Sequence, residues 1–244
     1  MLRIFLAIVL VLSVTNANAQ AVFSKEQTKE IQGIIESYIQ ENPEIVLKAL
    51  EALQKKNIEA REAAVKTAIK DNKAKLFHNK NDMFIGNKDG KIAIVEFFDY
   101  NCGYCKAMFD ILYKKVESNK DVKWILKELP TLSQNSLDVS IVAMAVAKQG
   151  KYQEFHKNMM KRKGSADKAA ALEVAKELGV DMKKLEKDMQ SKEIKDQLEA
   201  NQALAMSMEA GAVPAFVIGE DLILGAFSEK ELDEYIAKNY PDKK

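Results

Sequence analysis

Val95-Glu96-Phe97-Phe98-Asp99-Tyr100-Asn101-Cys102-Gly103-Tyr104-Cys105-Lys106 is the stretch around which the chain is organised. It is predicted to be a buried strand that runs directly into a helix, with a Cys-x-x-Cys pair at the junction. Cys102 and Cys105 are the only cysteines among the 244 residues. A disulfide between them would close a very small ring, which restrains little chain, so a stabilising role is a weak explanation. The pair therefore favours redox chemistry.

The predicted strand, residues 91–98, is apolar on both faces, which is typical of a central strand covered by helices. Glu96 interrupts it on the face shared with Ile94 and Phe98. A carboxyl group buried there would have its charged form disfavoured and could pass protons to and from Cys105. The alternative for Glu96 is a surface position at a strand edge, and its apolar neighbours argue against that position.

The helix after the strand carries Phe109, Leu112 and Val116 at helical spacing, the inward stripe of an amphipathic helix. Cys105 lies on this stripe and is expected to be buried, whereas Cys102 at the helix N-terminus is expected to be reachable from solvent. A helix N-terminus favours negative charge and lowers the pKa of a thiol placed there. Cys102 is therefore predicted to attack as a thiolate, and Cys105 to resolve the mixed disulfide.

Two later segments continue the α/β pattern. Residues 121–128 form a second predicted strand that stops at Pro130, and strand, helix and strand make a right-handed parallel unit. Near the C-terminus, a short strand follows Pro214, and residues 222–224 form its hairpin partner. Residues 228–231 (Ser-Glu-Lys-Glu) have the pattern of a capping box and begin a final helix.

Residues 135–209 are predicted to be wholly helical and therefore form an insertion in the α/β pattern. The predicted helix ends are Gly150 and Gly179, and the predicted helix starts are Ser165, Asp181 and Ser191. Seven methionines of this block could suggest soft-metal binding, but methionine fills irregular core gaps well, so a packing role is favoured.

Residues 1–19 have the composition of a secretory signal peptide. Arg3 gives one positive charge, residues 4–12 are apolar throughout, and Ala17-Asn18-Ala19 supplies small residues at the cleavage site. The alternative is a retained membrane anchor, for which the apolar run is short. We therefore expect export to an oxidising compartment.

Residues 25–76 are predicted to be helical almost throughout, with a break at Asn42-Pro43-Glu44, where Asn42 can cap the following helix. Val46, Leu50 and Leu53 recur there at helical spacing, without a second hydrophobic face. The segment must therefore pack on the rest of the chain or on copies of itself, and we expect a homo-oligomer. The predicted division is a signal peptide at 1–19, a helical oligomerisation segment at 20–78, and an α/β domain at 79–244 with its insertion at about 131–209.

The composition excludes some classes of function. The chain is 47% hydrophobic and 30% charged, as in soluble globular proteins, and 37 basic residues nearly balance 36 acidic ones. This balance gives no support for binding of nucleic acid or an anionic membrane, and Lys161-Arg162-Lys163 is interpreted as a solvated surface. His78 and His156 lack zinc-motif spacing to the cysteines, so no metal site is expected, and no organic cofactor either.

These motifs together resemble a known family. Residues 96–106, the helical block, and Val-Pro-Ala-Phe-Val-Ile-Gly at 213–219 resemble the DsbA-like branch of the thioredoxin superfamily. The helical segment before the first strand resembles, more narrowly, the periplasmic ScsC-type and Com1-type members. The resemblance covers essentially the whole chain after residue 19, and a Cys-x-x-Cys with a preceding strand, a following helix and a distant Pro-strand is a specific signal.

The resemblance implies a thioredoxin fold with a helical insertion and a catalytic pair formed by Cys102 and Cys105. It implies a cis proline at Pro214 that faces the pair, and substrate contacts from Val213 and Pro214 and from the Gly103-Tyr104 dipeptide. Glu96 matches the buried acid of the family. Lys127 is interpreted either as a charged neighbour of that acid or as an exposed strand residue.

Two departures from the family pattern bear on the direction of the reaction. Strong oxidases of the family carry Pro-His between the cysteines, whereas this chain has Gly103-Tyr104. Without the histidine, Cys102 loses one source of thiolate stabilisation, so its disulfide is expected to be less oxidising. Gly-Tyr resembles the periplasmic isomerases, whereas Val213 before Pro214 resembles the oxidases. Oligomeric members of the family tend towards isomerase or reductase behaviour, so the predicted oligomer favours an isomerase or reductase over an oxidase.

The sequence therefore predicts a periplasmic thiol–disulfide oxidoreductase, a disulfide oxidase or isomerase that acts on exported proteins through Cys102 and Cys105. A membrane or periplasmic redox partner would reset its redox state. One alternative is a soft-metal carrier, for example for copper, that uses the two thiolates as ligands. Another is a surface or scaffolding protein whose helical arm binds partners.

Overall fold

A computed structural model describes residues 23–242 of the chain. The predicted signal peptide, and with it the alternative of a membrane anchor, lies outside these described residues. Within residues 23–242, none of the helices combines the length and the apolar character needed to cross a membrane.

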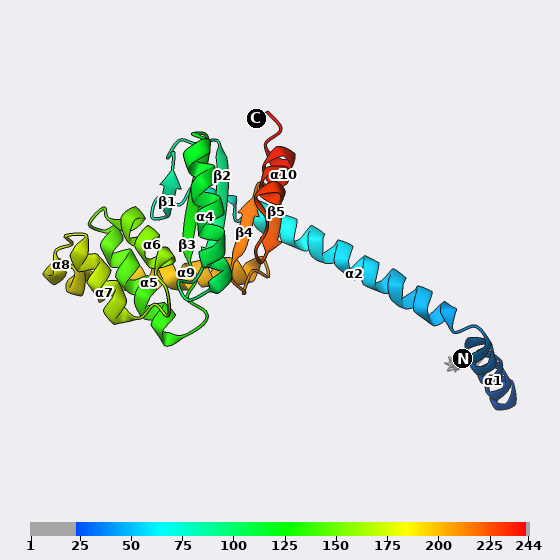
Figure 1. Cartoon of the computed structure of the whole chain (residues 1–244). Helices are drawn as coiled ribbons and strands as arrows, with labels where there is room; N and C mark the ends of the chain where they lie inside the picture. The colour runs from blue at the N-terminus through cyan, green and yellow to red at the C-terminus, as the bar shows by residue number, and fades with distance from the viewer. Residues whose placement is uncertain (1–22, 243–244) are drawn as a thin grey trace, which may run out of the picture. The chain divides into compact units, whose positions relative to one another are not determined.

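The centre of the fold is a five-stranded mixed sheet with the strand order β1-β3-β2-β4-β5 (Figure 1). The strands are β1 (Met83–Gly86), β2 (Ile92–Phe98), β3 (Val122–Glu128), β4 (Ala215–Ile218) and β5 (Asp221–Leu224). Strands β2 and β3 are parallel, and the remaining pairs are antiparallel. The predicted strands at 91–98 and 121–128 and the C-terminal hairpin are confirmed. Strand β1 was not predicted, because its four residues at the sheet edge carry no repeating pattern.

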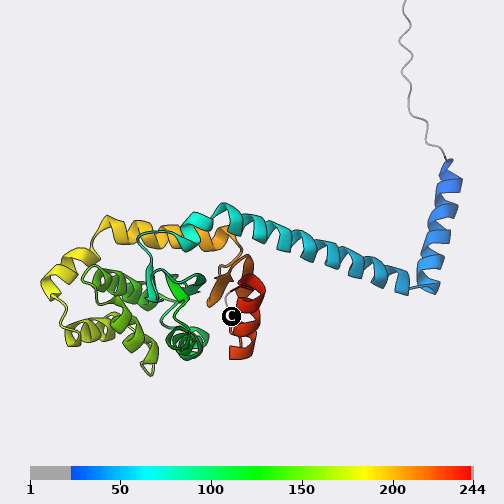
Figure 2. The same ribbon diagram turned by 90° about the horizontal axis from the view of Figure 1, so that it is seen from above.

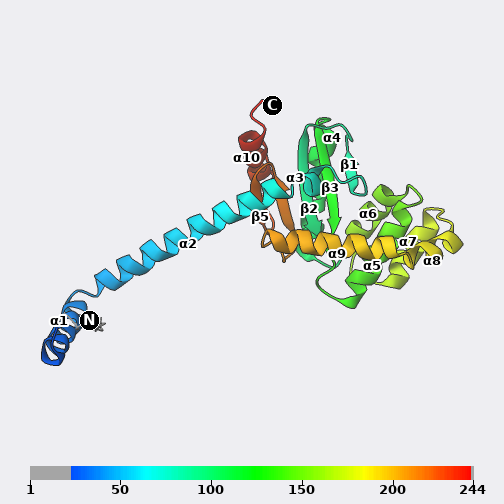
Figure 3. The same cartoon turned by 180° about the vertical axis from the view of Figure 1, so that it is seen from behind.

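Helices cover both faces of the sheet. Helix α4 (Gly103–Ser118) and helix α10 (Glu229–Asn239) pack on one face, over Ile94 and Phe98 of β2 and Phe216 of β4. Helix α3 (Lys73–Phe77), the last turns of α2 (Glu44–Asp71) and the end of α9 (Lys192–Ser207) pack on the other face (Figure 3). The sequence predicted this two-sided cover from the continuous apolar character of β2.

The predicted helical insertion is present between β3 and β4 and ends with α9, which lies beside the last turns of α2 (Figure 2). Its first four helices are α5 (Gln134–Ala147), α6 (Tyr152–Lys161), α7 (Lys168–Glu177) and α8 (Met182–Met189). Gly150 and Gly179 follow helix ends with positive φ, as expected of left-handed helix-ending residues. Helix α7 begins later than predicted, because the side chain of Asp167 and not that of Ser165 accepts the capping hydrogen bond.

Most methionines of the insertion contribute to the core, in agreement with the packing interpretation, whereas Met206 is 61% exposed and does not. Met144, Met159 and Met160 are buried in the cluster that also contains Phe155. A fully buried side chain of this size contributes about 1.5–3 kcal/mol to stability. The insertion therefore has its own apolar core, which is continuous with the core under α4.

The N-terminal helices α1 (Lys25–Glu41) and α2 confirm the helical prediction and the break at Asn42-Pro43. Asn42 ends α1 instead of capping α2, since its side-chain amide donates to the Tyr38 carbonyl. The chain divides into two compact units between Asn57 and Ile58, within α2. In the described part of the first unit, the large apolar side chains are exposed, for example Ile34 at 64% and Leu50 at 58%.

Candidate active site

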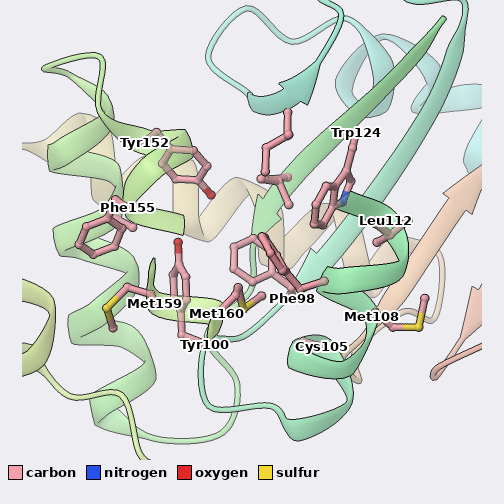
Figure 4. Packing of buried hydrophobic residues seen from close by; sticks show 14 of the residues in the cluster. Phe98, Tyr100, Cys105, Met108, Leu112, Trp124, Tyr152, Phe155, Met159 and Met160 are labelled. Atoms are coloured by element: carbon pink, nitrogen blue, oxygen red, sulfur yellow. The ribbon is translucent and has the colours of Figure 1, made fainter. Parts of the chain in front are cut away.

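The cysteine pair lies where β2 leads into α4, as predicted. Cys102 is the N-cap residue of α4, and its sulfur accepts a hydrogen bond from the Cys105 backbone N–H at 3.2 Å. Cys105 is fully buried among Phe109 and Leu112 on the inward stripe of the helix (Figure 4). Both cysteines are free thiols in the structure. The two sulfurs therefore differ in position, one at the helix end and one in the core.

Cys102 is more buried than predicted: its sulfur was expected to be reachable from solvent, but most of the residue is covered. Only 6% of the residue is exposed. The carbonyl oxygen of Val213 lies 3.6 Å from the Cys102 sulfur and covers it. Tyr104, between the cysteines, is 70% exposed and marks the open side of the site.

The loop before β4 reaches the cysteine pair, as the family resemblance implied. The Val213–Pro214 peptide bond is cis, in agreement with that expectation. Pro214 is buried, Val213 is half-buried, and Gly225 donates a backbone hydrogen bond to the Pro214 carbonyl. The fold thus brings together the two cysteines, Gly103, Tyr104, Val213 and Pro214.

The two thiols have opposite acidities. The hydrogen bond from the Cys105 thiol lowers the pKa of Cys102 to about 7, helped by the backbone N–H groups of Cys105 and Tyr104 and opposed by burial and the charge of Asp99. Burial, the hydrogen bond to Cys102 and the charge of Glu96 raise the pKa of the Cys105 thiol. Cys102 is therefore the thiol that becomes a thiolate near neutral pH.

Glu96 is buried beside this pair, and the alternative of an exposed strand edge is wrong. It is fully buried in the middle of the sheet, and its Oε2 accepts a hydrogen bond of 2.9 Å from the indole N–H of Trp124. Its Oε1 has no hydrogen-bond partner within the described part of the chain. Burial raises the pKa of Glu96 well above its ordinary value. The carboxyl group can therefore carry a proton next to Cys105.

Lys127 follows neither interpretation of the sequence. It lies opposite Phe97 in the register of β2 and β3, so it points to the face away from Glu96. Its ammonium group is buried and donates to Asp82 and to the Lys75 carbonyl, both at 2.6 Å. Lys127 is thus part of a buried ion pair on the other side of the sheet, because the side chains of successive strand residues alternate between faces.

Sequence reasoning missed Asp99, which is fully buried directly after β2. Its carboxylate accepts backbone hydrogen bonds from Asn101 in the active-site turn and from Thr131 and Leu132 in the loop after β3. The signal was available, because an aspartate that follows a strand and precedes a tight turn often accepts from the N–H two residues on.

A second missed group is Glu128 at the end of β3. Its carboxyl accepts hydrogen bonds from the hydroxyls of Tyr100, Ser140 and Tyr152, of which Tyr100 also contacts His156. In Figure 4 the Tyr100 and Tyr152 hydroxyls turn towards each other. No local sequence signal joins these residues, since they come from the active-site turn and three other elements.

The side chains that usually bind metals are not grouped into a metal site in the described part of the chain. No three or more His, Cys, Asp or Glu side chains of residues 23–242 are grouped so that they could hold a metal ion. His156 is a buried core residue, and burial lowers its pKa to about 3.

In the predicted surface run 161–163, Lys161 lies 3.5 Å from Asp110 and Arg162 lies 3.5 Å from Glu173.

Comparison with known proteins supports the same family from two directions. A family model described as Thioredoxin matches residues 78–238, and one described as Copper resistance protein ScsC N-terminal domain matches residues 27–60. A curated relative from Rickettsia bellii, provisionally named a protein-disulfide oxidoreductase, is 30% identical over 89 residues. The alignment spans about a third of this chain and about a third of that relative (34% of each).

Solved structures resemble the chain over a larger part. A thioredoxin-like oxidoreductase from Silicibacter pomeroyi is 31% identical with a TM-score of 0.65, covering 68% of this chain and 95% of that one. A linker-deletion mutant of Proteus mirabilis ScsC is 26% identical with a TM-score of 0.70, covering 91% and 99%. The thiol-disulfide exchange protein alpha-DsbA2 from Wolbachia pipientis is 25% identical with a TM-score of 0.67, covering 73% and 97%.

Proposed function

Because the chain belongs to the thioredoxin family, we propose that it is a thiol–disulfide oxidoreductase that acts on proteins through Cys102 and Cys105. The observation that carries this proposal is the difference between the two thiols. Cys102 has a pKa lowered to about 7 and stands at a helix N-terminus, whereas Cys105 is buried with a raised pKa. One thiol is suited to attack and leave, and the other to stay protonated until it resolves the intermediate.

In the reducing direction, the Cys102 thiolate attacks a substrate disulfide. A bond forms between Cys102 and one substrate sulfur, and the other substrate sulfur leaves as a thiolate. Cys105 then loses its proton and attacks the Cys102 sulfur, which releases the second substrate thiolate and leaves a Cys102–Cys105 disulfide. Two electrons pass from the protein to the substrate, and oxidation of a substrate dithiol is the same sequence in reverse.

Glu96 is proposed to move the proton of Cys105. Its charge acts on Cys105, and burial raises its pKa well above the ordinary value of a carboxyl group, so it holds a proton more readily than an exposed glutamate does. When Cys105 attacks, Glu96 takes up the proton, and when Cys105 is released as a leaving group, Glu96 returns it. Trp124 holds the carboxyl group in place through its indole N–H.

The substrate backbone is proposed to bind across the open side of the pair. Tyr104 is exposed there, Val213 presents its half-buried backbone, and Gly103 leaves open space, since a Cβ added to it would meet no atom within 4 Å. Pro214 lacks an N–H, so it cannot compete with a substrate for hydrogen-bond acceptors. Exported proteins with accessible cysteines are the proposed substrates, and no organic or metal cofactor is needed for the exchange.

The location and assembly are proposed from the N-terminal part of the chain. A signal peptide at 1–19 would direct the protein to the periplasm, and the exposed apolar residues of α1 and α2 would join copies into a homo-oligomer. The Gly103-Tyr104 dipeptide and an oligomeric arm both favour isomerase or reductase behaviour, with a membrane or periplasmic partner that resets the redox state. The reduction potential of the Cys102–Cys105 pair would separate a disulfide donor from a reductase or isomerase.

A trapping experiment tests the proposed function. Cys105→Ser is expected to accumulate substrate proteins joined to Cys102 by a disulfide, because the resolving thiol is gone. Non-reducing electrophoresis of periplasmic extracts, followed by reduction, would detect these complexes, and Cys102→Ser is the matched control that should trap none. Absence of complexes with Cys105→Ser, while wild type reduces insulin normally, would show that the assigned roles are wrong.

A second candidate function is that of a soft-metal carrier. The match of residues 27–60 to a model named for copper resistance favours this candidate, as do two thiols in one helical turn. The burial of Cys105 and its raised pKa count against it, because a metal ligand must be a thiolate. Titration of the reduced protein with Cu(I) separates the two: tight stoichiometric binding without insulin reduction would favour the carrier.

A further inference from the structure

We propose that Asp99 is a positioning residue whose buried charge fixes the turn before Cys102 and opposes the negative charge of the attacking thiolate. The proposal rests on the proposed function, and it assigns to this chain a built-in restraint on oxidising strength. Asp99 is three residues before Cys102, and the exchange reaction proposed above gives it no step.

The geometry around Asp99 joins two loops at one carboxylate. Its Oδ1 accepts the Asn101 N–H at 2.7 Å, and its Oδ2 accepts the Thr131 and Leu132 N–H groups at 3.0 and 3.1 Å. Its backbone carbonyl accepts the Cys102 N–H at 3.1 Å, which closes the turn. The position of the Cys102 backbone therefore depends on Asp99 through both its main chain and its side chain.

Three N–H donors match a charged carboxylate and not a neutral amide. Charge-assisted hydrogen bonds offset part of the cost of burying the charge, and Asp99 is fully buried. A neutral asparagine would have to turn its amide N–H₂ towards one of the N–H donors. The site thus holds a negative charge in the interior, a short distance along the chain from the thiol that must itself become negative.

The neighbouring groups show which way this charge acts. The charge of Asp99 raises the pKa of Cys102, against the lowering effect of the Cys105 thiol and the helix N–H groups. Glu96 and Cys105 are the other titratable groups that interact with Cys102, and Glu128 interacts with Asp99. All of these remain in a variant that changes only position 99, so the variant isolates the effect of Asp99.

The consequence for redox chemistry follows from the stability of the reduced state. A stabilised Cys102 thiolate makes the dithiol form more favourable and the disulfide more oxidising. Asp99 destabilises that thiolate, so it makes the disulfide less oxidising and keeps it nearer to the range of reductases and isomerases. Removal of the charge should shift the protein towards a disulfide donor.

The test is a titration of the Cys102 thiolate by its ultraviolet absorbance in the reduced full-length protein. Asp99→Asn is expected to raise the acid dissociation constant of Cys102 by about three- to tenfold, as expected for loss of a nearby negative charge. Measured at a pH above the Cys102 pKa, the equilibrium with glutathione should shift towards the reduced protein by up to the same factor, since the thiolate is the stabilised species. Asp99→Glu, which keeps the charge, should stay within about twofold of wild type.

Controls separate charge from structure. Asp110→Asn removes a charge from the exposed face of α4 and is expected to leave the dissociation constant unchanged. If Asp99→Asn does not fold, Asp99→Ser gives the same readout with a smaller neutral side chain. An unchanged dissociation constant in a folded neutral variant, an equal shift in Asp99→Glu, or loss of folding in every neutral variant would each overturn the proposal and leave Asp99 with a purely structural role.

Failure of this inference is distinguishable from failure of the proposed function. The titration and the glutathione equilibrium use no substrate protein, so they report on Asp99 whether or not the chain acts on proteins. Insulin reduction by the wild type tests the function separately.

Discussion

Glu96 and Glu128 are two buried carboxyl groups on the same face of neighbouring strands, yet their surroundings differ. In the parallel register, Glu96 lies opposite Leu126 and Glu128 opposite Phe98, so both side chains point towards the α4 side of the sheet. Glu96 accepts one hydrogen bond from Trp124 and has a second oxygen without a partner in the described chain. Glu128 accepts three hydroxyl hydrogen bonds.

The difference shows that hydrogen bonding, and not burial alone, decides what a buried acid does. Burial raises the pKa of both groups, to about 8 for Glu128 despite its three hydroxyl donors. Glu128 is held by its donors and joins the active-site turn to the insertion, so its role is structural. Glu96 has one oxygen without a hydrogen-bond partner among residues 23–242 and acts electrostatically on Cys105, so it can exchange a proton.

The largest effect is expected for Glu128→Ala, which would leave three buried hydroxyls without their acceptor and a cavity beside them. We expect the free energy of unfolding to fall by about 3–5 kcal/mol. Chemical denaturation measures this change. Glu199→Ala on the exposed side of α9 is the matched control, expected to cost under about 0.5 kcal/mol. An equal fall in the free energy of unfolding in both variants would contradict the structural role of Glu128.

A pH series gives an effect of similar size. Because the folded state raises the pKa of Glu128 from 4.5 to about 8, its stabilising contribution is complete below the lower value and is lost as pH rises through the higher one. Wild type should therefore lose up to about 5 kcal/mol relative to Glu128→Gln over this range, because each unit of pKa shift is worth about 1.4 kcal/mol. Denaturation of both proteins at several pH values measures the difference, and parallel curves would contradict the assigned shift.

Glu96→Gln tests the other half of the comparison. The variant keeps the shape and the Trp124 hydrogen bond but cannot take up a proton, so resolution by Cys105 should slow about tenfold, equivalent to about 1.4 kcal/mol in the barrier. Fluorescence of Trp124, the only tryptophan, follows the rate of disulfide formation. Glu128→Gln is the matched control and should keep its rate within about twofold, while its stability changes.

The smallest effect is expected for Tyr152→Phe, which removes one of the three donors to Glu128. We expect a loss of about 1 kcal/mol in the free energy of unfolding, the usual worth of a single hydrogen bond. Tyr235→Phe on α10 is the control. A loss as large as that of Glu128→Ala would mean that the donors do not act separately.

Much of the fold was accessible from the sequence because its signals are local. The apolar run of β2, the stripe of α4 and the capping box at Ser228 and Glu231 each lie within a few residues, and the structure has all three. Strand β1 was missed because four edge residues give no pattern. Asn42 was predicted to cap α2 but ends α1. A capping residue between two helices can bond to either of them, and the local sequence does not show which.

The site was accessible only in part, because its remaining contacts join distant segments. The positions of Cys102 and Cys105 followed from spacing, but the cover over Cys102 comes from Val213, more than a hundred residues away. Lys127 was considered a neighbour of Glu96, and strand alternation places it on the opposite face. Asp99 was within reach of turn chemistry, whereas the hydroxyls around Glu128 meet only in three dimensions.

The buried ion pair of Lys127 and Asp82 has a consequence for how this family can diverge. The side chain of Lys127 is 1% exposed and that of Asp82 is 7% exposed. Loss of either charge would therefore leave the other charge buried without its partner. Removal of one partner of such a pair costs about 3–5 kcal/mol, whereas replacement of both by apolar residues is often neutral. We therefore expect descendants of this sequence to carry both charges or neither, because each single-step intermediate between these states is selected against.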